Sequence, residues 1–181
     1  MIAPLRSGAV VIATASPKNF SLVLSYGANA VFDYHDPECG SKIRAFSNNS
    51  LRYVLDCISV ESSYKIDAAA LSTDTSQELH CLTLLPPDSW PSERKDVNVR
   101  WMLAYTSFGE EFFKFGATYP VSSEHYEVGV NFWKLNGKLL KEGKIRTHPV
   151  TVREGGLLSV PEGYETLSPE CDSHFYWLPW P

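Results

Sequence analysis

The sequence lacks the patterns of several common classes of protein. No apolar run in its 181 residues approaches the ~20 needed to span a bilayer. Its net charge of -5, from 16 basic and 21 acidic residues without a basic cluster, argues against partners such as nucleic acid or an anionic membrane. The amino terminus has no secretory signal pattern, so we expect a cytoplasmic protein.

The cysteines show no CxxC or Cys/His spacing, so the sequence indicates no metal site. There are four of them, Cys39, Cys57, Cys81 and Cys171. Cys57 and Cys81 lie in strand-like segments, where a reduced and buried thiol is expected. The histidines are dispersed, and no Ser/His/Asp or Cys/His arrangement follows from their order, so no catalytic residue is assigned.

Strand-like and helix-like segments alternate through the first half of the chain. The predicted strands are 9–14, 30–34, 51–58, 79–85 and 97–108, and the predicted helices are 19–26, 41–46 and 62–71. This order is typical of an α/β fold, a Rossmann-like, doubly wound, mostly parallel sheet with helices on both faces. The length suits one domain.

The second half contains the clearest helical pattern, at 123–143. We expect its apolar residues, Tyr126, Phe132, Trp133 and Leu140, to belong to the core, with docking of a carrier protein as the alternative. A strand is predicted at 145–152, a turn at 153–156 and a helix at 157–167 with Pro161 in its first turn. Residues 168–181 follow neither period, and we expect a disordered tail.

The end of the first predicted strand has the composition of a nucleotide site. In dinucleotide-binding folds an acidic residue at this position accepts hydrogen bonds from the ribose 2′-hydroxyl of NAD. Ser16 and Lys18 stand here instead, and a hydroxyl with a cation favours the 2′-phosphate of NADP. The alternative is structural, with Ser16 as a helix N-cap and Lys18 solvated.

The glycine-rich turn that would bind the pyrophosphate does not precede this strand. Residues 1–8 are too few for a strand, a turn and a helix, and we interpret them as the last turn of a helix closing at Gly8. We therefore expect the carboxyl part of a larger enzyme.

An ordered set of motifs resembles the fungal trans-acting enoyl reductases, zinc-free members of the medium-chain dehydrogenase/reductase superfamily. The motifs are VIATASPKNF at 11–20, GANAVFDY at 27–34, LRYVLDCI at 51–58, WMLAYTSFGE at 101–110, KIRTHP at 144–149 and VREGG at 152–156. The resemblance covers about residues 5–167. It implies that 1–167 is a partial NADP-binding domain with the start of a return to the catalytic domain, whose amino-terminal part is missing.

The resemblance also implies a cofactor site. Ser16, Pro17, Lys18 and Asn19 would surround the adenosine 2′-phosphate of NADPH. Tyr34 would lie against the adenine, and Leu103 and Ala104 would line the nicotinamide side. General acid chemistry at Tyr34 or His35 is disfavoured, because a tyrosine at a strand end ordinarily packs its ring.

The function implied is reduction of an α,β-unsaturated thioester with NADPH. The substrate would be held by the acyl carrier domain of a partner polyketide synthase in fungal secondary metabolism, and we expect the reductase to be a monomer. Two alternatives remain open: an inactive remnant or protein-interaction module, and a quinone or alkenal reductase of the same superfamily.

Overall fold

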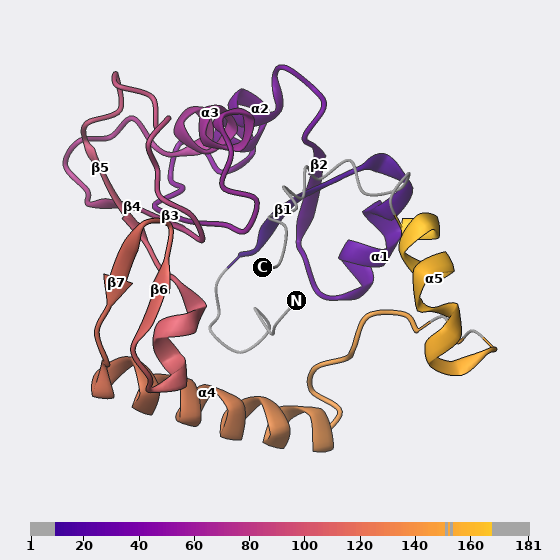
Figure 1. Cartoon of the computed structure of the whole chain (residues 1–181). Helices are drawn as coiled ribbons and strands as arrows, with labels where there is room; N and C mark the ends of the chain where they lie inside the picture. Colours follow the sequence, from indigo (N-terminus) through magenta and orange to yellow (C-terminus); the bar gives the residue numbers. More distant parts are fainter. Residues whose placement is uncertain (1–9, 151, 153, 168–181) are drawn as a thin grey trace. The chain divides into compact units, whose positions relative to one another are not determined.

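The computed structural model describes residues 10–150, 152 and 154–167 (Figure 1). The chain divides into two units, 1–146 and 147–181. In chain order the elements are β1 (Ile12–Ala15), η2 (Pro17–Asn19), α1 (Phe20–Ser25), β2 (Ala30–Asp33), α2 (Cys39–Phe46), β3 (Tyr53–Asp56), α3 (Glu61–Ala70), β4 (Leu79–Thr83), β5 (Val97–Trp101), η3 (Ala104–Phe108), β6 (Phe112–Lys114), β7 (Ala117–Tyr119), α4 (Ser123–Lys141), η4 (Gly156–Ser159) and α5 (Val160–Leu167).

The expected α/β alternation is confirmed, with the parallel strands divided between two sheets. Strand β1 pairs with β2, and β4 lies between β3 and β5. In the common doubly wound order, one further strand separates the strands that correspond to β1 and β3. Among the described residues no strand pairs with both, so the single sheet expected from the sequence is seen here as two.

Helices α2 and α3 hold the first unit together by packing directly on each other (Figure 1). Gly40 makes this possible, because a Cβ there would lie 2.6 Å from the Ala69 Cβ atom and 2.6 Å from the Ile66 carbonyl oxygen. A cluster of Cys39, Ile43 and Ala70 is buried between the helices. Four partly buried side chains pack against this cluster: Ile12 of β1, Phe32 of β2, Leu51 just before β3 and Ile66 of α3.

The three-stranded sheet has its own core. Leu71, Leu79, Cys81 and Val97 are buried in one cluster, with Leu51, Val54, Trp90 and Val99 packed against it. Strand β4 supplies Leu79 and Cys81 on the same face, as the period of two requires.

The other face of β3 is exposed, with Tyr53 at 64% and Leu55 at 62% of their full accessible surface. Cys57 follows this strand and is exposed, so the prediction of a buried thiol is confirmed for Cys81 and wrong for Cys57. The reason is that strand β3 ends at Asp56 and Cys57 already belongs to the turn. Cys171 lies outside the described residues.

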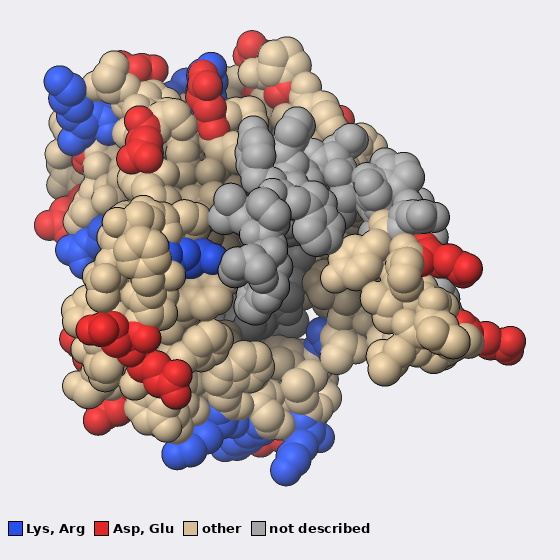
Figure 2. Space-filling view, in the orientation of Figure 1, with Lys and Arg blue, Asp and Glu red and all other residues tan. Residues whose placement is uncertain are grey.

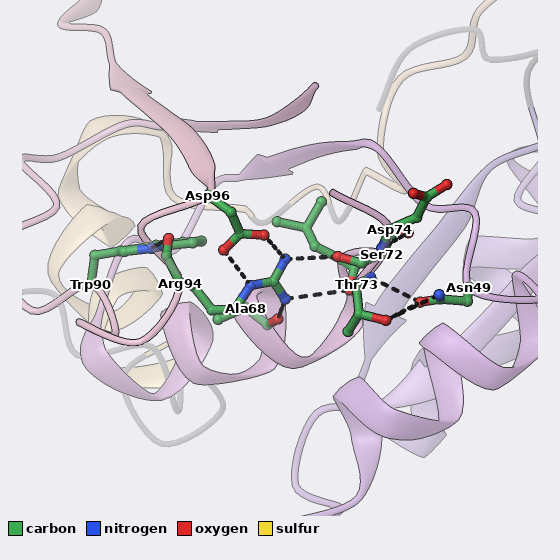
Figure 3. A network of polar contacts seen from close by, with 9 residues as sticks. Asn49, Ala68, Ser72, Thr73, Asp74, Trp90, Arg94 and Asp96 are labelled. Carbon is green, nitrogen blue, oxygen red and sulfur yellow. Dashed lines mark hydrogen bonds and ion pairs between the residues drawn. The ribbon is translucent and has the colours of Figure 1, made fainter. Parts of the chain in front are cut away.

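Arg94 closes the carboxyl end of helix α3 (Figure 3). Its guanidinium donates to the carbonyl oxygens of Ala68 and Ser72 and forms two 3.0 Å hydrogen bonds with the Asp96 carboxylate. The last carbonyls of a helix lack partners within the helix, and a cation there also interacts well with the helix dipole. The loop before β5 is thereby attached to α3.

The region after β5 departs from the sequence prediction. The predicted strand 97–108 ends at Trp101 and is followed by η3, and β6 and β7 form an antiparallel hairpin that the sequence did not indicate. Helix α4 then packs against η3, where a Cβ at Gly129 would lie 2.9 Å from the Ser107 Cβ atom. At Gly109, where φ is 77°, a Cβ would lie 2.8 Å from Tyr126 Cδ2.

The prediction that the aromatic face of α4 is core is wrong. Tyr126, Phe132 and Leu140 are exposed, and 72% of Trp133 is accessible. Among the described elements α4 has its main contact with η3, which is too short to cover a helix of 19 residues. Helical periodicity correctly identified an amphipathic helix, and the burial of its apolar face depends on neighbours that periodicity does not report.

In the second unit, η4 packs against helix α5. Pro161 lies in the first turn of α5, as predicted. The predicted strand 145–152 is not formed, since residues 146–150 have no regular structure. The predicted tail 168–181 lies outside the described residues.

Charges of both signs are interspersed on the face shown in Figure 2. Lys and Arg side chains gather along the lower edge of that view, and acidic side chains lie on the remaining described surface together with further basic ones. Among the described helices, none combines the length and apolar character that a membrane span requires.

Candidate nucleotide site

The carboxyl ends of β1 and β2 bring together two residues that the sequence analysis assigned to the cofactor. Ala15 and Asp33 are paired in the parallel register, so Ser16 and Tyr34 leave the two strands side by side. Their hydroxyl oxygens, Ser16 Oγ and Tyr34 Oη, are 2.9 Å apart. In open α/β sheets ligands bind outside the carboxyl ends of the strands, which is where this pair lies.

The loop after β1 is formed by a tight turn. Pro17 begins η2, and the backbone N–H of Asn19 donates to the Ser16 carbonyl oxygen over 2.9 Å. The side chain of Ser16 makes no capping hydrogen bond. Ser16 therefore occupies the N-cap position and Lys18 is exposed, as the structural alternative predicted, but the Ser16 hydroxyl is bonded to Tyr34 and caps no backbone N–H.

Lys18 is the free cation of this loop. Its side chain is exposed and forms no ion pair or hydrogen bond with any residue that the structure describes. The nearby acids already have partners: Asp36 is paired with Lys42, and Asp33 with His35. The Lys42 ammonium, as the first cause, and the Glu38 N–H hold the pKa of Asp36 below its ordinary value. A phosphate dianion would thus meet an ammonium that is paired with no described residue, and the Asp36 carboxylate already has a cationic partner.

Asp33 and His35 extend the site beyond the residues that the sequence analysis assigned to the cofactor. The backbone N–H of His35 donates to Asp33 Oδ1 over 2.9 Å, and His35 Nδ1 lies 2.8 Å from the same oxygen. These contacts, the backbone one first, lower the pKa of Asp33. The imidazole packs on Tyr34, with ring centroids 4.1 Å apart. The spacing Asp-Tyr-His at a strand end, which favours a side-chain turn, is the signal that could have identified them.

The remaining predicted site residues lie on the other parallel sheet. Leu103 is buried and Ala104 is exposed, just after β5, where the Met102 N–H donates to the Thr83 carbonyl oxygen over 3.0 Å. They too follow the carboxyl end of a parallel strand. Among the described residues no hydrogen bond joins them to Ser16 or Tyr34, so their role in the same site stays a prediction.

A pair of carboxyl groups lies at the end of β3. Asp56 accepts hydrogen bonds from the backbone N–H groups of Ile58 and Ser59, at 2.8 and 2.9 Å, and from Ser63 Oγ at 2.6 Å. Asp67 on α3 has a buried Oδ2 atom without a hydrogen-bond partner among the described residues. Burial first, and then the neighbouring Asp56, raise the pKa of Asp67 to about 8. Its buried position therefore favours the protonated form of Asp67.

Comparisons with known proteins agree with the motifs. No protein-family model matches the sequence. The trans-enoyl reductase ACTTS2 of Alternaria alternata is 44% identical over 161 residues, which are 89% of this chain and 45% of that protein. The lovastatin nonaketide synthase enoyl reductase component lovC of Aspergillus terreus is 36% identical over 167 residues, or 89% of this chain and 44% of that protein.

A third relative is the dual trans-enoyl reductase/FAD-dependent monooxygenase tazHJ of Aspergillus terreus. It is 39% identical over 158 residues, 87% of this chain and 22% of that protein. Among solved structures, the apo form of JamJ enoyl reductase superimposes with a TM-score of 0.56 at 16% identity, over 92% of this chain and 46% of that one. That likeness supports the fold.

The chain thus spans a little under half the length of the first two curated relatives and of the solved reductase. The motifs that predicted the family run across the matched region, from the Ser16 loop to the segment before α5. The chain is therefore related by sequence to the fungal trans-enoyl reductases.

Proposed function

We propose that this chain forms the adenosine-binding part of an NADPH-dependent trans-enoyl reductase. The observation that carries the proposal is the Ser16 and Tyr34 hydroxyl pair, 2.9 Å apart at the carboxyl ends of adjacent parallel strands, with Lys18 exposed in the loop that follows Ser16. No acidic residue stands at the end of β1, where an NAD-specific site would have one. The names of the relatives support the reaction class.

The residues of this loop fit the 2′-phosphate of NADPH. The Ser16 hydroxyl would donate to a phosphate oxygen, the Lys18 ammonium would neutralise its charge, and Pro17 and Asn19 would set the loop around it. Tyr34 would present its ring to the adenine. Bound NADPH supplies a hydride for the β-carbon of an enoyl thioester. The chain's own contribution is to bind and orient the cofactor, and Leu103 and Ala104 would line its nicotinamide side.

We propose further that the substrate is an α,β-unsaturated thioester on the acyl carrier domain of a partner polyketide synthase. The relative lovC supports this, because its name describes a component of a polyketide-type synthase. No described residue is assigned as proton donor at the α-carbon. A quinone or alkenal reductase would differ in accepting a small free substrate and ignoring the carrier-bound one.

A nucleotide titration tests the proposal. We expect saturable binding of NADPH by the folded 181-residue chain and much weaker binding of NADH. Lys18→Ala should weaken NADPH binding about tenfold and leave NADH binding within twofold, because a charge-assisted hydrogen bond contributes roughly 1.5–3 kcal/mol. Lys95→Ala is the control, since Lys95 is also exposed and lies before β5. Equal binding of both dinucleotides, or none by a cooperatively folding sample, would refute the proposal and favour an interaction module.

A further inference from the structure

A continuous chain of contacts links Asp33 to Ser16 in the candidate site. Asp33 holds the His35 imidazole at 2.8 Å, the imidazole packs on the Tyr34 ring at 4.1 Å with an interplanar angle of 34°, and the Tyr34 hydroxyl lies 2.9 Å from Ser16 Oγ. Tyr34 is itself 37% accessible, so packing around it is incomplete. The His35 imidazole is therefore one of the contacts that restrict the position of this ring.

We propose that His35, anchored by Asp33, is a positioning residue that holds the Tyr34 hydroxyl on Ser16 and thereby selects an adenosine that carries a 2′-phosphate. The inference rests on the proposed function and adds to it a group that does not contact the phosphate. Its effect is transmitted in two steps, from the imidazole to the phenol ring and from the phenol hydroxyl to the serine hydroxyl.

The selectivity follows from hydrogen-bond chemistry. When Tyr34 donates to Ser16 Oγ, the serine hydroxyl proton is directed elsewhere and is available to an acceptor. A phosphate dianion offers only acceptors, so it gains from a serine whose proton is already oriented outward. An unmodified ribose 2′-hydroxyl donates or accepts, and therefore gains little from that orientation.

The test compares two ligands on the folded 181-residue chain. Adenosine 2′,5′-bisphosphate carries the 2′-phosphate, and adenosine 5′-monophosphate has the same adenine without it. His35→Ala should weaken the bisphosphate about three- to tenfold, the range for loss of one hydrogen bond, and the monophosphate less than twofold. Tyr34→Phe should do the same, and the double variant should be no weaker than Tyr34→Phe alone, because His35 acts through the tyrosine hydroxyl.

The chain offers a matched control in His80. This imidazole stacks on Tyr53 with centroids 5.3 Å apart, on the other parallel sheet, so His80→Ala removes a similar contact away from the site. It should leave both affinities unchanged. Thermal unfolding establishes that each variant is folded.

The possible results separate the two proposals. Equal weakening of both ligands by His35→Ala, or an additive loss in the double variant, overturns the positioning role and leaves the proposed function standing. Failure of the folded wild-type chain to bind the bisphosphate overturns the proposed function and this inference together.

Discussion

Asp67→Asn is expected to stabilise the folded chain at neutral pH. The unfolded carboxyl group ionises near its ordinary pKa of 3.8, whereas burial and the nearby Asp56 raise the folded pKa to about 8. Because the pKa of Asp67 is raised in the folded state, the contribution of this carboxyl group to the free energy of unfolding is complete below pH 3.8 and is lost as the pH rises toward 8. At pH 7 the wild-type chain must therefore either protonate Asp67 or bury its charged carboxylate when it folds, and both cost free energy.

The magnitude follows from the same two values. Neutral pH lies roughly three pH units above 3.8, and each unit corresponds to 1.36 kcal/mol, so the cost at pH 7 is at most about 4 kcal/mol. Relaxation of the site reduces this, and we expect a gain of about 2 kcal/mol for Asn, which keeps the shape and a donor toward Asp56. At pH 4 the variant and the wild type should be nearly equal.

Urea unfolding between pH 4 and 8 measures the effect. The control is Asp74→Asn, the same substitution at a carboxylate whose pKa is lowered by the hydroxyl and N–H of Ser76, and it should give no gain at pH 7. A stability difference between Asp67→Asn and wild type that does not grow with pH would refute the reasoning.

Three further substitutions test the packing of α2, α3 and α4 by chemical denaturation. Gly40→Ala should cost about 1–3 kcal/mol, because the new methyl group overlaps Ala69, whereas Gly137→Ala on α4 meets no atom within 4 Å and should gain about 0.5–1 kcal/mol. Equal effects at both glycines would contradict the close approach of α2 and α3. Arg94→Met should lower the free energy of unfolding by about 2–4 kcal/mol, because the carbonyl oxygens at the end of α3 and the Asp96 carboxylate lose their hydrogen-bond donor. The control Arg52→Met, at an exposed arginine, should cost less than about 0.5 kcal/mol. Similar losses for both variants would argue against a capping role of Arg94.

Local sequence signals predicted most of the first unit. The strands around Ile12 and Val31, the helix before Gly27 and the helix at 123–141 were each visible in hydrophobic period and in capping residues, and Gly27 has the positive φ expected of a helix end. The β6–β7 hairpin was missed because its strands have three residues each, too few to establish a period of two. The predicted strand 145–152 failed because apolar residues alone do not supply a pairing partner.

The sequence predicted which residue types belong to the candidate site, but it did not predict how their side chains contact one another. Ser16 and Lys18 were identifiable because their residue types differ from the acid of an NAD-specific site. That the Ser16 hydroxyl bonds to Tyr34, and to no backbone N–H of the helix that Ser16 precedes, depended on the register of β1 and β2. His35 was considered for proton transfer and set aside, and its support of Tyr34 became visible only through the ring contact and the bond to Asp33.

The sequence by itself determined the order and type of most elements, the related family and the residue types at the end of β1. These depend on local periodicity and on motifs, which are properties of neighbouring residues. The tertiary structure decided which strands pair, that the two hydroxyls meet, that Asp67 lies buried beside Asp56, and that the apolar face of α4 is exposed. Each of these depends on contacts between residues distant in the chain, because burial and pairing are set by the elements that pack against a segment.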